Sequence, residues 1–257
     1  MDNNRICFVL DTHYPNYTKR LKTTSLKDYI DFNLKDLGVG FIITTNRPED
    51  FDDYSSKGIM VYDIDELRKD HKTSIKYEIL YEDPTGIYPS RFPWNLERFG
   101  LKKAAELGYN VVVNLDSDVK FNTEHDALNF VNYLNSIYEE NTIVTNQAIF
   151  KYKKNSQNEI FHLHEKYKEH FHLNYEDYQY DSLDGPVIIY MGKTSEDIIR
   201  YFKVWNMLTD FGYEKEFGFG YEGIVCGNWS LAIPMAGYKL RWESLPLTPF
   251  HKFEDRY

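Results

Sequence analysis

Two carboxylates separated by one small residue follow the most apolar run near the middle of the chain. Residues 111–115 read VVVNL, and Asp116, Ser117 and Asp118 come directly after them. Hard divalent cations such as Mg²⁺ and Mn²⁺ prefer oxygen ligands, and they commonly bind one or two carboxylates together with the phosphates of a substrate. The pair predicts a metal site at the tip of a buried strand, while the plainer alternative is that both acids only cap a loop.

A further acid occupies a comparable position near the start of the sequence. The apolar run 6–10 ends at Asp11, just as 111–115 ends at Asp116. Ligands of open α/β sheets bind beyond the carboxyl ends of the strands. Both acidic positions are therefore expected at one edge of a sheet.

The elements that must position these acids alternate between strands and helices. Strands are predicted at 6–10, 41–45, 59–64, 111–115, 142–150 and 186–191, and helices at 24–37, 93–107, 127–138, 195–208 and 223–235. This alternation favours an α/β fold with a Rossmann-like, mostly parallel sheet flanked by helices. A single domain over 1–257 is expected, with an insertion at 151–181, where the sequence is polar, basic and aromatic without clear periodicity.

The segment NVVVNLDSDVKF, residues 110–121, resembles the DxD motif of GT-A glycosyltransferases, which transfer a sugar from a nucleotide donor. The resemblance implies a nucleotide-sugar-binding half over about 1–120 and an acceptor-binding half over about 121–257. It implies that Asp118 binds Mn²⁺ or Mg²⁺ and that Asp116 contacts the metal or the donor ribose. Because DxD enzymes of this kind commonly use them, a uridine diphosphate (UDP) sugar is the expected donor.

The same resemblance implies roles for residues elsewhere in the chain. In GT-A enzymes the end of the first strand holds the base and ribose, and that strand end corresponds here to Leu10, Asp11, Thr12 and His13. Arg98 resembles a frequent basic residue near the donor phosphates. His251, in the segment PFHKF, matches the place where many such enzymes return a histidine to the metal.

Residues 217–223, FGFGYEG, resemble the GWGxED segment of inverting galactosyltransferase-like members. Glu222 takes the Glu position and is the candidate general base, whereas Gly223 replaces the acid that follows it in those relatives. A retaining enzyme would not need Glu222 in that role. The sequence leaves the stereochemical outcome open.

Two other patterns invite different interpretations. Gly218, Gly220 and Gly223 also spell G-x-G-x-x-G, but no buried strand precedes them and too little chain follows for a dinucleotide-binding domain. Four histidines within the expected insertion form two H-x-H pairs that could bind zinc: His162, His164, His170 and His172. Their basic and aromatic neighbours favour a solvated, acceptor-facing lid.

The composition restricts the compartment and the partners. The chain has 257 residues, with 30 Lys and Arg against 40 Asp and Glu and a net charge of -10, which disfavours nucleic acid as a bulk partner. Cys7 and Cys226 lie in apolar stretches and are expected to be reduced core residues. No leader or membrane anchor is expected. The abundant Asn, Lys and Tyr are typical of an AT-rich coding genome, so we expect the cytoplasm of a bacterium or of a virus-infected cell.

These patterns together predict a metal-dependent glycosyltransferase. The acceptor is expected to be a glycan, a protein or a modified nucleobase. A sugar-phosphate nucleotidylyltransferase is an alternative, but it requires a Gly-rich loop after the first strand, and residues 10–17 contain no glycine. A carbohydrate-binding module, with the acids around a structural calcium, is the non-enzymatic alternative.

Overall fold

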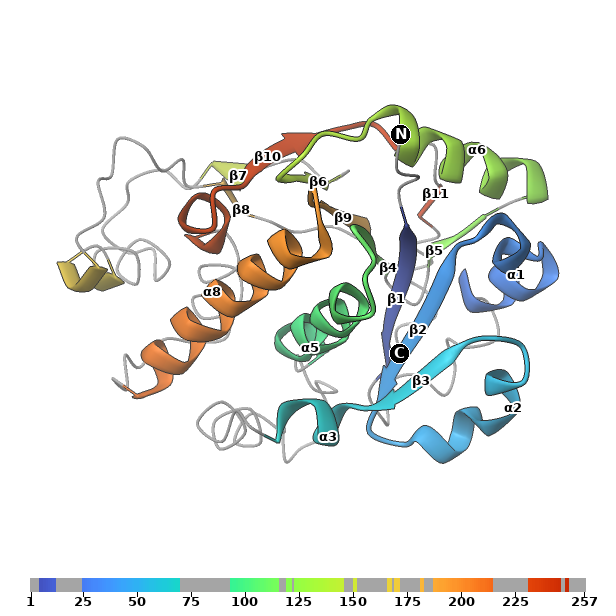
Figure 1. Cartoon of the computed structure of the whole chain (residues 1–257), viewed down its shortest axis with the longest axis horizontal. Coiled ribbons are helices and arrows are strands. Elements are labelled where there is room, and N and C mark those ends of the chain that lie inside the picture. The colour runs from blue at the N-terminus through green and yellow to red at the C-terminus, as the bar shows by residue number, and fades with distance from the viewer. Residues whose placement is uncertain are drawn as a thin grey trace.

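Seven strands form one sheet within the residues that this computed structural model describes (Figure 1). The described residues are 5–12, 25–69, 93–115, 119–121, 123–145, 150–151, 166–167, 169–171, 181–182, 187–214, 231–245 and 248–249. The strands are β1 (Ile6–Thr12), β2 (Gly40–Thr45), β3 (Met60–Asp63), β4 (Val111–Leu115), β6 (Thr142–Thr145), β9 (Val187–Met191) and β10 (Lys239–Trp242).

The order across the sheet is β10-β6-β9-β4-β1-β2-β3. Strand β9 runs antiparallel to both of its neighbours, and every other pair of neighbouring strands in this sheet is parallel. The expected mostly parallel α/β sheet is therefore confirmed. Consequently β1, β2, β3, β4, β6 and β10 all end at the same edge, which we call the carboxyl edge.

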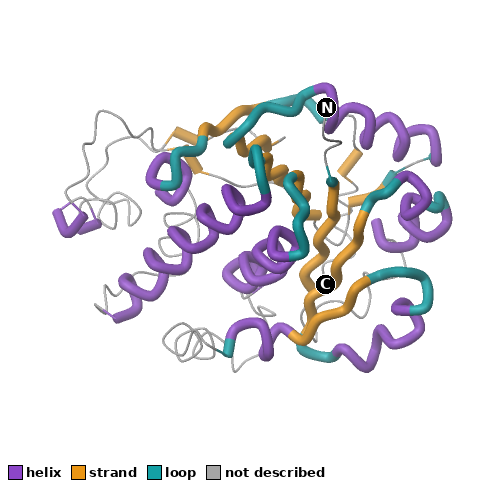
Figure 2. Tube along the Cα trace, in the orientation of Figure 1, coloured by secondary structure: helices purple, strands orange, loops and turns teal. Residues whose placement is uncertain are grey.

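Helices cover both faces of the sheet (Figure 2). The helices are α1 (Ser25–Asp31), α2 (Asp52–Ser55), α3 (Ile64–Arg68), α5 (Pro93–Glu106), α6 (Glu124–Ser136) and α8 (Ser195–Glu214), with 3₁₀ turns at η2 (Leu34–Leu37) and η3 (Pro48–Phe51). Strand alternation sends Cys7 and Val9 toward α5 and α8, and Phe8 toward α1 and α6. These two apolar layers hold the sheet on both sides.

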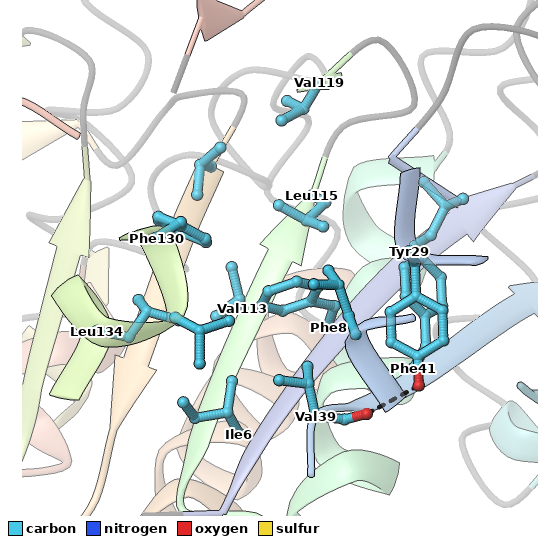
Figure 3. Packing of buried hydrophobic residues seen from close by; sticks show 14 of the residues in the cluster. Ile6, Phe8, Tyr29, Val39, Phe41, Val113, Leu115, Val119, Phe130 and Leu134 are labelled. Carbon is cyan, nitrogen blue, oxygen red and sulfur yellow. Dashed lines mark hydrogen bonds between the residues drawn. The ribbon is translucent and has the colours of Figure 1, made fainter. Parts of the chain in front are cut away.

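The layer on the α1 and α6 face is rich in aromatic rings (Figure 3). Phe8 packs against Phe41 and Phe130, with ring centroids 6.4 and 5.9 Å apart. The hydroxyl of Tyr29 donates to the carbonyl oxygen of Val39 at 2.8 Å, so its buried polar tip is satisfied. Each such fully buried ring stabilises the fold by about 1.5–3 kcal/mol.

Several predicted boundaries differ from the observed ones. The helix expected at 24–37 is divided, because Asn33 adopts a left-handed backbone with φ 51° between α1 and η2. The strand expected at 59–64 ends earlier, because Asp63 caps α3 by accepting a hydrogen bond from the Asp65 N–H. The helix expected at 195–208 continues to Glu214. Of the helix expected at 223–235, the described part, 231–235, is helical.

The two ends of the expected insertion lie side by side. Strand β7 (Phe150–Lys151) pairs antiparallel with β8 (Asp181–Ser182). Within the insertion, Tyr167 is fully buried and its hydroxyl donates to the carbonyl oxygen of Leu208 on α8 at 2.5 Å. The His170 ring stacks on Phe211 at 4.0 Å, while His162, His164 and His172 lie outside the described residues.

Two expectations from composition concern the state of the two cysteines and the presence of membrane-spanning helices. Cys7 is a free, fully buried thiol, and burial raises its pKa, so the reactive thiolate is disfavoured. Cys226 lies outside the described residues. None of the helices in the described part of the chain combines the length and apolar character needed to span a bilayer.

Helix α5 approaches the sheet closely at Gly100. A Cβ atom built there would lie 2.6 Å from Thr44 Cγ2 and 3.1 Å from Val9 Cγ1. We expect Gly100→Val to destabilise the protein by about 2 kcal/mol or more, because the buried branches cannot be accommodated. Urea unfolding measures the change in the free energy of unfolding. The control is Lys102→Val on the same helix, which should lower that free energy by less than about 1 kcal/mol. Equal stability of the two variants would contradict the close approach.

Candidate functional site

The ends of β1 and β2 form a polar pair at the carboxyl edge. Asp11 lies opposite Thr44 in the parallel register, and the Thr44 hydroxyl donates to the Asp11 carboxylate. Thr44 is fully buried and Asp11 is partly exposed. A buried hydroxyl thus fixes the carboxylate of a partly exposed residue, and Asp11 Oδ2 is itself buried.

Asn114 extends this polar region to the neighbouring strand. It pairs in register with Val9 of β1 and is only 2% exposed. Because side chains alternate along a strand, Asn114 lies on the same face as Val112, which is also the face of Val9 and of helix α5. Three adjacent strands therefore each carry one polar residue near their carboxyl ends, on the α5 face.

Neither Thr44 nor Asn114 was among the residues predicted to form the site. The available signal was a polar residue near the carboxyl end of a mainly apolar strand. Asn114 additionally stands just before Leu115 and the two acids. Threonine is common in strands, and a single asparagine carries little information, so their face and register had to come from the sheet.

Leu10 and Thr12, which were predicted to contact the donor, lie on β1. The Leu10 side chain is fully buried in the core on the α1 and α6 face, so any donor contact of Leu10 would involve its main chain. The Thr12 main chain pairs with Thr45 at the end of β2. His13 lies outside the described residues, as do Asp116, Asp118, Glu222 and His251.

Arg98 lies inside the protein, between two helices. Its side chain is fully buried, its Nε donates to Asn206 Oδ1 on α8 at 2.5 Å, and its guanidinium carbon lies 4.4 Å from the centre of the Phe99 ring. A charge in this environment requires such partners, because removal from water is costly. The described contacts make Arg98 a link between α5 and α8, and its predicted contact with donor phosphates stays a prediction.

Strands flank the two predicted acidic ligands on both sides. Residues 116–118 join the end of β4 to the start of β5 (Val119–Lys120), and both Leu115 and Val119 are buried. Strand β5 pairs antiparallel with β11 (Thr248–Pro249), with Val119 opposite Pro249. The N–H of Phe121 then donates to the Asp28 carboxylate on α1 at 2.7 Å, which attaches this segment to the domain.

Tyr62 lies beside Thr44 on β3, at the outer end of the same edge. The Lys103 ammonium lies 5.2 Å from the centre of the Tyr62 ring. Burial raises the pKa of Tyr62, so its hydroxyl stays protonated at neutral pH and can donate a hydrogen bond. Among the described residues, no three His, Cys, Asp or Glu side chains come together as a metal-binding set.

Comparison of this chain with known proteins shows similarity in structure only. No protein-family model matches the sequence, and no curated protein does. The fold is similar to mouse xyloside xylosyltransferase 1 in its apo form, with 10% sequence identity and a TM-score of 0.47 over 93% of this chain and 84% of that chain. It is also similar to core-mannan synthase A from Aspergillus fumigatus in a Mn/GDP form, with 13% identity and a TM-score of 0.48 over 94% and 73% of the two chains.

A third similar structure is CMP:2-keto-3-deoxy-manno-octonic acid synthetase complexed with CTP. It shares 10% identity at a TM-score of 0.39, over 93% of this chain and 89% of that chain. All three TM-scores are below 0.5, so we draw no functional conclusion from these similarities.

The position of Arg98 predicts a structural effect of its removal. We expect Arg98→Met to lower the free energy of unfolding by about 2–3 kcal/mol, because the buried Asn206 amide loses its charged partner. Urea unfolding measures the change. The control is Arg200→Met on α8, whose partly exposed ion pair with Asp197 should contribute less than about 1 kcal/mol. If Arg98→Met were as stable as the unmodified protein, Arg98 would not link the helices.

Proposed function

We propose that this protein is a metal-dependent glycosyltransferase of GT-A-like architecture, which transfers a sugar from a nucleotide-sugar donor to an acceptor hydroxyl. The observation that carries the proposal is the pairing of β5 with β11. This ladder joins the segment that follows Asp118 to the segment that precedes His251. The two segments are more than a hundred residues apart in sequence, so local structure does not explain their contact.

The direction of the ladder supports one metal site formed from both segments. In an antiparallel pair, one step backward from Val119 corresponds to one step forward from Pro249. The chain therefore leads to Asp118 on one strand and toward His251 on the other, in the same direction. Two carboxylates and one imidazole are a suitable ligand set for Mn²⁺ or Mg²⁺ in the presence of a diphosphate.

The donor nucleotide is assigned to the neighbouring strand end. β1 lies directly beside β4 in the parallel register, so Asp11 is at the same edge as the chain that leaves Leu115. A carboxylate fixed by the Thr44 hydroxyl offers acceptor oxygens for ribose hydroxyls or base N–H groups. A UDP-sugar is the proposed donor, with its ribose and base near Asp11 and its diphosphate near Asp116.

The chemistry divides among the residues of the chain. A divalent ion, when bound, stabilises the negative charge that develops on the leaving diphosphate. Asp118 and His251 would hold that ion, and Asp116 would contact the ion or the ribose. Glu222 would orient the acceptor hydroxyl and accept its proton, for which a nearby carboxylate is well suited.

A thermal-shift measurement with UDP and Mn²⁺ tests the metal site. Ligand binding raises stability by mass action, by about 2.7 kcal/mol at a ligand concentration a hundred times the dissociation constant. We expect UDP to raise the melting temperature of the unmodified chain by several degrees only when Mn²⁺ is present. Asp118→Asn should remove this Mn²⁺-dependent increase, because an amide is a weaker ligand than a carboxylate.

Glu66→Gln is the matched control, because Glu66 is an exposed acid on α3 that pairs only with Lys69 among its described contacts. It should respond to UDP and Mn²⁺ like the unmodified chain. Full Mn²⁺-dependent stabilisation of the Asp118→Asn variant would overturn the assignment of the metal.

Slow hydrolysis of the donor tests the proposed base. With Mn²⁺ and a panel of UDP-sugars, the chain should release UDP, because water can replace the acceptor. Glu222→Gln should lower this rate by about 10²- to 10⁴-fold, while the Mn²⁺-dependent stabilisation by UDP stays intact. An unchanged rate would exclude Glu222 as the base.

A further inference from the structure

One exposed indole marks the far end of the carboxyl edge. Trp242 is the last residue of β10 and is 51% exposed. Of the exposed large hydrophobic side chains in the described part of the chain, it is the most exposed and the only aromatic one. An exposed indole offers a large, flat apolar face on which a ligand ring can stack.

The sheet register relates Trp242 directly to the proposed active site. Trp242 pairs with Thr145, Thr145 with Ile188, and Ile188 with Asn114, so Trp242 and Asn114 belong to one row across the sheet. Residues paired in this way lie on the same face. Three strand spacings separate β10 from β4, which corresponds to about 14 Å along the carboxyl edge.

The main chain on both sides of Trp242 is held firmly from the opposite face. Arg241 donates to Glu139 at 2.7 Å and to the carbonyl oxygen of Ile137 at 2.6 Å. Glu243 binds the Arg241 guanidinium at 3.0 Å, and its N–H donates to the Thr145 carbonyl oxygen at 3.0 Å. These contacts fix the strand, so the indole is presented from a rigid support and little order is lost when a ligand binds.

The indole does not belong to a larger exposed apolar patch of the described residues. Lys239, Arg241 and Glu243 lie on the opposite face of the strand, and the neighbour of Trp242 on its own face is the partly buried Leu240. Aromatic anchors of protein interfaces usually lie inside a larger apolar patch, whereas the other exposed large apolar side chains in the described part of the chain lie on η2, α6 and α8. A single exposed ring at the edge of the sheet suits a ligand with one apolar face and many hydroxyl groups, which describes a sugar ring.

We propose that Trp242 is an acceptor subsite, on which a sugar ring of an oligosaccharide acceptor stacks. This inference rests on the proposed function, because it places the acceptor relative to the metal and donor near β4. The gap between the two places is too wide for a monosaccharide, so the acceptor is an oligosaccharide that extends along the carboxyl edge. The reacting hydroxyl would lie beyond the end of β4, and a distal ring would lie on Trp242.

An oligosaccharide array tests the subsite without a donor. The unmodified chain, Trp242→Ala, Trp242→Phe and Met207→Ala are applied to the same printed array. We expect the unmodified chain to bind a set of oligosaccharides and Trp242→Ala to bind them roughly tenfold more weakly or worse. Trp242→Phe should recover most of the affinity, because a benzene ring still offers a stacking face. Met207→Ala, which removes an exposed apolar side chain on α8, should bind like the unmodified chain.

Urea unfolding of each variant shows whether a loss of binding reflects misfolding, and the Phe variant keeps the test valid if the Ala variant is unstable. Absence of oligosaccharide binding by the unmodified chain, or equal binding by the folded Trp242→Ala variant, would overturn the inference. Binding of a single-stranded RNA oligonucleotide through Trp242 in place of oligosaccharides would also overturn it. Failure of UDP and Mn²⁺ to stabilise the unmodified chain would instead count against the proposed function, so the two failures are distinguishable.

Discussion

The parallel ladder through β1 is the constraint on which the rest of the structure depends. Strand β1 lies between β2 and β4, and its apolar side chains are buried on both faces. A one-residue slip in the pairing of β1 would move Phe8 into the core layer that now holds Val9, and Val9 into the layer that now holds Phe8. The same slip would move Asp11 to the other face of the sheet. The packing of both cores therefore places the carboxylate beside Thr44, whose hydroxyl then fixes it.

Polar residues near the carboxyl edge interrupt this apolar packing. Thr44 and Asn114 are buried, and they directly follow the apolar residues 41–43 of β2 and 111–113 of β4. Burial of polar groups costs free energy unless they find partners, and the Thr44 hydroxyl finds one in Asp11. Departures from apolar patterning are typical of functional sites. The close approach of α5 at Gly100 encloses this polar region from one side.

Short ladders between distant segments complete the arrangement. Pairing of β5 with β11 connects the residues after the two acids with a segment near the end of the sequence, and pairing of β7 with β8 closes the base of the insertion. Tyr167 packs on Phe211, which lies in the part of α8 that extends beyond its predicted end at residue 208. Each of these contacts joins residues far apart in the chain.

The local sequence pattern was sufficient to predict most helices and strands, but it did not predict the environments of individual side chains. Continuous apolar runs such as residues 111–115 identified the buried strands, because strands covered on both faces need no polar alternation. The order of elements likewise indicated the parallel sheet. The helix break at Asn33 was missed, because a left-handed residue leaves little trace in hydrophobic periodicity.

The sequence by itself determined the α/β class and the presence of acids at or just after the ends of two apolar runs, because both depend on neighbours along the chain. Only the tertiary structure decided that Arg98 lies inside between α5 and α8, that Thr44 supports Asp11, and that Trp242 shares a row with Asn114. Helix rotation and strand register decide these facts. Both follow from packing between segments that are distant in sequence, which a local pattern does not encode.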